Sequence, residues 1–143
     1  AEKLYGAGNG DQKLAYAEEI LRKHGIRLDT ATLKAMIDAQ IKEMVRRGCL
    51  IGLNYYGVFL RDDGDVRSLD DLYRHIAHFF DLGAQKSLAL GSDFDGADLP
   101  DCLSSPEKVA AAYDYLLSRG LTQRELDGIF YENARAFLRA HLR

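Results

Sequence analysis

The chain has 143 residues, 47% of them hydrophobic, so it is long enough for one domain with a buried core. Its 19 lysines and arginines are mixed along the sequence with 22 aspartates and glutamates, which leaves no basic stripe for a nucleic-acid backbone. No apolar run approaches the roughly 20 residues of a membrane-spanning helix. We therefore expect neither a nucleic-acid partner nor a transmembrane segment.

The two cysteines fit no metal-ligand spacing. Cys49 lies in an apolar run, and Cys102 lies in a stretch with the composition of a loop. One potential pair does not make a disulfide framework. We expect two reduced thiols and a cytoplasmic protein.

The N-terminal third is predicted to be helical after a glycine-rich lead-in over residues 1–10. A first helix is expected from about Asp11 to Lys23, ended by Gly25. A second is expected from about Thr30 to Arg47. Its apolar residues recur at helical spacing: Leu33, Met36, Ile37, Ile41, Met44 and Val45.

Two short apolar runs are predicted to be buried strands. The first covers residues 49–56, and the second begins at Leu88. Between them, residues 57–67 have the composition of a loop, and a helix is expected to begin at Ser68 with a capping box to Asp71. A strand, a helix and a strand joined by about thirty residues form a crossover, so the two strands should be parallel.

The C-terminal third is predicted to hold two helices. One begins with Ser105 as its cap and runs to Arg119, and the last begins at a capping box of Thr122 and Glu125 and continues unbroken. Two parallel strands leave open edges that need neighbours. The chain is therefore expected to be part of a larger sheet or barrel, or to obtain strands from a partner.

The candidate site is the acidic stretch that follows the second strand. Period-two geometry would place Asp93 and Asp95 on one side of the strand end, and Gly96 would allow a sharp exit. One alternative is ordinary turn chemistry. A calcium-binding loop does not fit, because a strand comes first and the terminal glutamate is missing.

A second alternative is a phosphatase of the haloacid dehalogenase type. Asp93 would then attack phosphorus, Asp95 would be the general acid, and magnesium would hold the phosphate. However, Ala97 stands where that loop has threonine or serine. The 47 residues after Gly96 also contain no second acidic strand end.

A third interpretation rests on a series of motifs in a fixed order. From about Ile37 onward the chain resembles the C-terminal part of the membrane (renal) dipeptidase family, which are zinc-dependent metallopeptidases. The matching segments are Arg47-Gly-Cys-Leu-Ile-Gly-Leu-Asn-Tyr-Tyr56, Leu72-Tyr-Arg-His-Ile-Ala-His78, Ala89-Leu-Gly-Ser-Asp-Phe-Asp-Gly96, and Leu117-Leu-Ser-Arg-Gly120 through Ile129-Phe-Tyr-Glu-Asn133.

This resemblance implies an α/β fold, a partial (β/α)₈ TIM barrel made of its last two parallel strands and their covering helices. It implies hydrolysis of dipeptides with two zinc ions, with Asp93 as the catalytic residue and Asn54 and Tyr56 as substrate-binding residues. Residues 1–30 are then an unmatched lead-in and helix, and residues 31–143 are the C-terminal part of the barrel.

The resemblance does not extend to the metal ligands, which the family takes from its first six strands. We therefore expect no metal ligand in this chain, an isolated chain without activity, and either the remaining barrel half or further copies of the chain as partners. His75 and His78, at i,i+3 on one helix, are predicted to be structural or surface histidines. A further alternative is a noncatalytic remnant that assembles with itself through its open strand edges.

Overall fold

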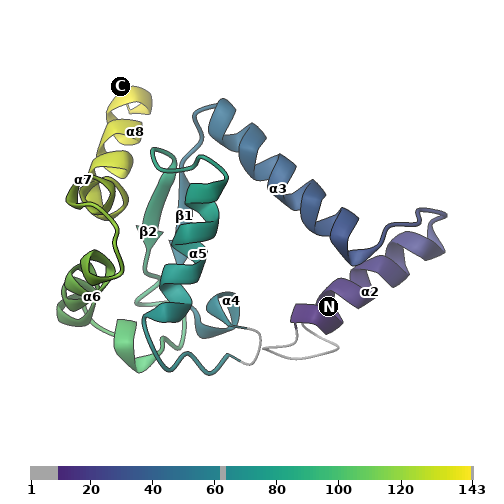
Figure 1. Cartoon of the computed structure of the whole chain (residues 1–143), viewed down its shortest axis with the longest axis horizontal. Coiled ribbons are helices and arrows are strands. Elements are labelled where there is room, and N and C mark those ends of the chain that lie inside the picture. Colours follow the sequence, from purple (N-terminus) through teal and green to yellow (C-terminus); the bar gives the residue numbers. More distant parts are fainter. Residues whose placement is uncertain (1–9, 62–63, 143) are drawn as a thin grey trace.

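The computed structural model describes residues 10–61 and 64–142, with side chains from residue 15. An arm of two helices projects from a body that surrounds a small sheet (Figure 1). In chain order the elements are α2 (Gly10–Lys23), α3 (Thr30–Arg46), β1 (Ile51–Asn54), α4 (Gly57–Leu60), α5 (Asp70–Asp81), β2 (Leu88–Gly91), the 3₁₀ helix η1 (Asp101–Leu103), α6 (Pro106–Ser118), α7 (Gln123–Asp127), the π-helix η2 (Gly128–Glu132) and α8 (Asn133–His141).

The sheet of the described chain has two parallel strands, as predicted. Ile51 pairs with Leu88, and the register continues to Asn54 opposite Gly91. Helix α5 lies across the sheet, and α6 to α8 lie on the β2 side (Figure 1). The core between these layers contains Leu53, Tyr55, Leu60, Leu72, Ile76, Leu88, Leu103, Ala112, Leu116, Leu126 and Ile129.

Side-chain caps fix the starts of three helices. Asp29 accepts a hydrogen bond from the Thr32 amide at 2.7 Å at the start of α3. Ser105 caps α6, and the predicted capping box of Thr122 and Glu125 is present in both directions at α7. These caps satisfy backbone amides that a helix leaves without partners at its first turn.

The predicted loop over residues 57–67 is wrong at its start, where α4 forms. Leu60 is 3% exposed and anchors this single turn in the core. Gly57 lies so close to the Gly64 carbonyl that a β-carbon would be 2.6 Å from its oxygen. The apolar i,i+3 pattern of this turn is too short to stand out in sequence.

The predicted capping box at Ser68 is also wrong. Ser68 Oγ accepts from the Asp70 amide at 3.3 Å, but Asp71 does not turn back toward the backbone of Ser68. Its carboxylate instead pairs with Arg61 and Arg74. Two arginines outcompete a backbone amide for a buried carboxylate.

Two elements differ in extent from the prediction. The first strand is shorter, Ile51–Asn54, and Gly52 is exposed, so β1 is not buried on both faces. The last helix is interrupted by η2, where Gly128 packs against the Asn133 amide group. This amide donates to the carbonyls of Gln85 and Leu88, both at 2.7 Å. The contact ties α8 to the start of β2, and the π-turn accommodates it.

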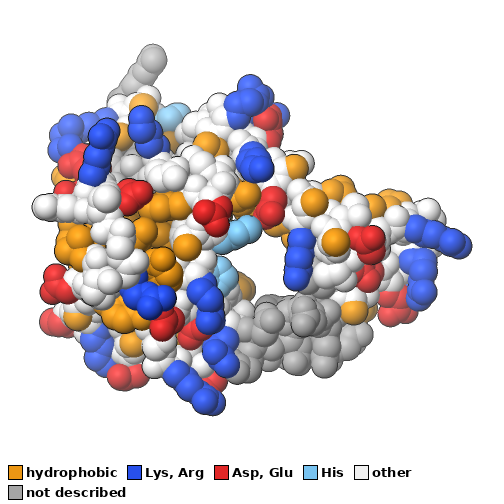
Figure 2. All heavy atoms as spheres, viewed as in Figure 1, with side chains coloured by type: hydrophobic (Ala, Val, Ile, Leu, Met, Phe, Trp, Pro, Cys, Tyr) orange, Lys and Arg blue, Asp and Glu red, His pale blue; other side chains and the backbone are white. Residues whose placement is uncertain are grey.

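The apolar stripe of α3 lies outside the buried core. No residue of α3 is buried, and Met36 is 50% and Ile37 48% exposed. Apolar side chains therefore lie at the surface of the arm (Figure 2). A contact of 3.0 Å between Asp38 and the His78 Nε2 joins α3 to α5. Within the described part of the chain, the residues of this stripe are half-buried at most.

Across residues 10–61 and 64–142, no helix has the length and apolar character needed to span a membrane.

Candidate active site

The carboxyl ends of the two parallel strands meet at the acidic stretch. Asn54 is the last residue of β1 and lies opposite Gly91, the last residue of β2. Asp93 follows two residues later. The strand ends at Gly91, so the period-two argument that placed Asp93 and Asp95 on one side of a strand does not apply.

Asp93 is positioned by a tight turn. Its φ is +59°, in the left-handed region, where it is the one non-glycine residue of the described chain. The amides of Gly96 and Ala97 both donate to its carbonyl oxygen at 3.2 Å. Its side chain is exposed, and Oδ2 accepts a hydrogen bond of 3.2 Å from the Asn54 Nδ2.

The predicted site residues thus lie together. Asn54 contacts Asp93 through its amide nitrogen, and its amide oxygen accepts from the backbone N–H of Tyr56 at 2.7 Å. Tyr56 is half-buried and its ring meets Phe59 edge-on, with centroids 5.3 Å apart. Phe59, which sequence reasoning missed, is 56% exposed on α4.

An apolar contact joins the Asp93 turn to the core. Phe94, the residue after Asp93, meets the buried ring of Tyr55 edge-on, with ring centroids 6.3 Å apart. Burial raises the pKa of the Tyr55 phenol well above its usual range. The Asp93 carboxylate is therefore exposed to solvent, while the turn that carries it contacts the core through Phe94.

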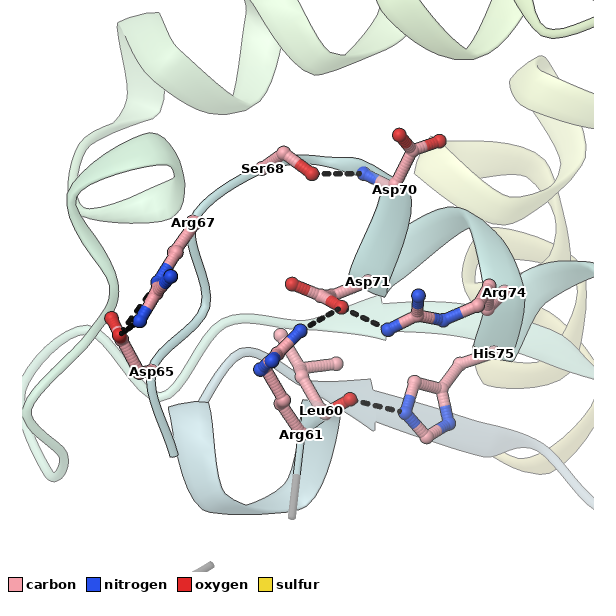
Figure 3. A network of polar contacts seen from close by, with 9 residues as sticks. All are labelled: Leu60, Arg61, Asp65, Arg67, Ser68, Asp70, Asp71, Arg74 and His75. Carbon is pink, nitrogen blue, oxygen red and sulfur yellow. Dashed lines mark hydrogen bonds and ion pairs between the residues drawn. The ribbon is translucent and has the colours of Figure 1, made fainter. Parts of the chain in front are cut away.

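A polar network holds α4 beside this site. The Asp71 carboxylate, 3% exposed, faces Arg74 and lies 3.7 Å from Arg61 (Figure 3). The ring of His75 points to the Leu60 carbonyl, with 2.8 Å from Nε2 to oxygen (Figure 3). Both contacts join α5 to the end of α4. His75 and His78 have different partners and do not form a pair.

The donor set of this site does not fit a zinc pair. A zinc ion in a protein takes three or four protein ligands. In the described part of the chain, no three histidine, cysteine, aspartate or glutamate side chains gather where they could hold a metal ion. Cys49 and Cys102 are free thiols, and burial raises the pKa of Cys102.

The model of the membrane dipeptidase family, peptidase family M19, matches residues 28–141. The chain belongs to the membrane dipeptidase family. The strand-end motifs that carried the resemblance lie inside this match. The division at residue 30 and the roles of Asp93, Asn54 and Tyr56 stay predictions.

Two curated proteins have sequences similar to that of this chain. An uncharacterised protein encoded in the pqqA 5′ region of Klebsiella pneumoniae is 33% identical over 101 residues, which are 68% of this chain and 37% of the relative. An uncharacterised dipeptidase of Schizosaccharomyces pombe is 30% identical over 86 residues, 59% of this chain and 21% of the relative. The chain thus spans about a third or less of their lengths.

Two crystal structures share the fold of this family member. One is the metallopeptidase dipeptidase AC of family M19, with a TM-score of 0.65 and 26% identity over 71% of this chain and 31% of the other. The second is a metallopeptidase from Rhodobacter sphaeroides, liganded with a phosphinate mimic of the dipeptide L-Ala-D-Ala. It has a TM-score of 0.66 and 25% identity over 71% of this chain and 30% of the other.

Proposed function

We propose that this chain is the C-terminal part of a zinc-dependent dipeptidase and that Asp93 is its catalytic residue. One observation carries the proposal: in a member of the dipeptidase family, an exposed carboxylate is held at the carboxyl ends of two parallel strands. In α/β barrels this edge of the sheet is where active sites lie.

The chemistry assigned to Asp93 is proton transfer. In dipeptide hydrolysis a water oxygen adds to the peptide carbonyl carbon, the C–N bond breaks, and the departing nitrogen takes up a proton. A carboxylate beside the peptide can accept the proton that water loses and deliver it to that nitrogen. Oδ2 is held by Asn54, so a lone pair of Oδ1 is the natural site for this proton.

The zinc ions of this proposal require ligands from outside the described part of the chain. Asp93 is a single carboxylate, and no metal-binding group surrounds it there. We assign the two zinc ions to the remaining polypeptide of the barrel. On this proposal the 143-residue chain is inactive by itself.

The shape of the molecule supports a place in a (β/α)₈ barrel. Each of its two strands has an open edge in the described structure, and such edges require further strands. Met36, Ile37 and Met44 leave an apolar stripe on α3 exposed. Strands and helices of the missing two thirds would cover both. The two free cysteines favour a cytoplasmic location.

The test compares two purified proteins with zinc added: the product of the complete gene and the 143-residue chain. We expect the complete product to release amino acids from dipeptides and Asp93→Asn to remove this activity while zinc content is unchanged. A zinc-loaded complete product that cleaves no dipeptide would refute the proposal. Native mass spectrometry gives the zinc content and copy number in the same samples.

A noncatalytic remnant that assembles with itself is the second candidate, favoured by the same open edges and the exposed stripe on α3. It predicts an oligomer of the 143-residue chain without zinc. The family membership favours a dipeptidase over the phosphatase alternative, which would require magnesium-dependent release of phosphate.

A further inference from the structure

Asn54 uses both ends of its side-chain amide within the site. The oxygen accepts from the Tyr56 amide at 2.7 Å, and the nitrogen donates to Asp93 Oδ2 at 3.2 Å. The Tyr56 N–H can donate but not accept, so it fixes which end of the amide carries the oxygen. The NH₂ group must therefore face the carboxylate of Asp93.

The Asp93 carboxylate has few other constraints. It projects from an exposed turn, and among the residues that the structure describes, Asn54 is its one hydrogen-bond donor. On its other side Oδ1 lies against the α-carbon of Gly96, where a β-carbon would be 2.4 Å away. Asn54 beside one oxygen and the Gly96 backbone beside the other limit the orientations open to the carboxylate.

We propose that Asn54 is the positioning residue for the Asp93 carboxylate, in place of the substrate-binding role expected from the sequence. This inference rests on the proposed role of Asp93 in proton transfer. Asn54 holds Oδ2, directs the lone pairs of Oδ1 outward, and joins the end of β1 to the turn after β2. Such orientation matters because proton transfer requires the donor and acceptor within hydrogen-bond reach.

The alternative role leaves Asn54 little to offer a substrate. Its oxygen is occupied by the Tyr56 amide and one N–H by Asp93, and the residue is half-buried. One N–H and one lone pair of the oxygen remain. A substrate-binding Asn54 would contribute to KM, whereas a positioning Asn54 acts through Asp93 and contributes to kcat.

The decisive variant is Asn54→Asp in the zinc-loaded product of the complete gene. Aspartate has the same shape and still accepts from the Tyr56 amide, so the turn into α4 is kept. It cannot donate to Asp93 when ionised, and it places two like charges side by side. We expect kcat to fall about tenfold or more at neutral pH, with KM within about twofold of the parent.

Acidification gives a second signature. A protonated aspartic acid at position 54 can donate to Asp93 again, so the kcat of N54D relative to the parent should rise as the pH falls. The other carboxylates of this loop, Asp95 and Asp98, are exposed and are present in both proteins. A raised KM with unchanged kcat, or a ratio independent of pH, would overturn the inference.

A structural readout separates this inference from the proposed function. In crystal structures of the parent and Asn54→Ala, we expect the Asp93 carboxylate in one orientation in the parent and in several in the variant. If the carboxylate stays in place, the inference fails whatever the activity. If it moves but the parent cleaves no dipeptide, the proposed function fails and the positioning contact stands.

The matched control is Asn133→Ala, which removes another bridging asparagine amide at the opposite end of β2. This variant loses two hydrogen bonds and should lower the melting temperature. Its kcat per folded molecule should equal that of the parent. An equal loss of kcat in both asparagine variants would refute a specific role of Asn54.

Discussion

The Gly96 backbone lies directly against the carboxylate of Asp93. A β-carbon at position 96 would be 2.4 Å from Oδ1, far inside van der Waals contact, and 3.3 Å from Cγ, a tight contact. The φ of Gly96 is not in the left-handed region. Glycine is therefore needed at position 96 because a β-carbon would collide with the Asp93 carboxylate. Its backbone conformation does not itself require glycine.

Gly96→Ala should displace the Asp93 carboxylate with little effect on folding. We expect kcat of the zinc-loaded enzyme to fall about tenfold or more, because the proton acceptor is turned away. The free energy of unfolding should change by less than about 1 kcal/mol, since the turn is exposed. Gly52→Ala is the control, because no atom lies within 4 Å of its β-carbon position. Equal kinetics of the two variants would contradict the contact.

Substitutions of Asp93 should separate stability from activity. Its φ of +59° suits glycine and is costly for alanine, by roughly 1–2 kcal/mol. We expect Asp93→Gly to be more stable than Asp93→Ala by about 1 kcal/mol in thermal unfolding, and both to be inactive. Equal stabilities would mean that the turn does not hold this φ in solution.

Loss of the Asp71 carboxylate should destabilise the junction of α4 and α5. Asp71 is 3% exposed and its partners Arg74 and Arg61 reach solvent, so the arginines can be hydrated after the change. We expect Asp71→Ala to cost about 2 kcal/mol, as for charged hydrogen bonds. Denaturant unfolding measures this cost. Asp101→Asn, in an exposed pair with Lys108, should change stability by less than about 0.5 kcal/mol.

Tyr55 should make stability sensitive to alkaline pH. Burial raises the pKa of its phenol above the unfolded value of about 10. The unfolded chain then loses the proton first, so the contribution of Tyr55 is complete below pH ~10 and is lost as the pH rises toward the folded pKa. Tyr55→Phe should remove this part of the alkaline loss. Urea unfolding of both proteins at pH 8 and pH 11 tests the difference.

The strands and most helix starts could be predicted because each depends on local chemistry, and the parallel pairing followed from the crossover connection. Ser105 and Thr122 cap helices through atoms three residues away, which sequence spacing reveals. Asp71 shows the limit of this reasoning. Its spacing from Ser68 suggests a cap, but Arg61 comes close only once α4 has formed.

Three candidate site residues came from the sequence, whereas the contacts that join them did not. Asp93, Asn54 and Tyr56 came from a family resemblance, and the structure places them at one end of the sheet. The left-handed turn at Asp93 was not foreseen, because aspartate in the sequence gives no sign of its φ. The exposure of Met36 and Ile37 was also unforeseen, since periodicity identifies an apolar face without naming what covers it.

The two hydrogen bonds of Asn133 affect the order in which parts of the fold become stable during synthesis. This side chain anchors the start of β2 across a separation of 45 residues, so the strand is secured only after the last helices have been synthesised. During translation β2 can leave the ribosome well before α8 exists to hold it. The turn that carries Asp93 therefore reaches its final geometry only after α8 has been made.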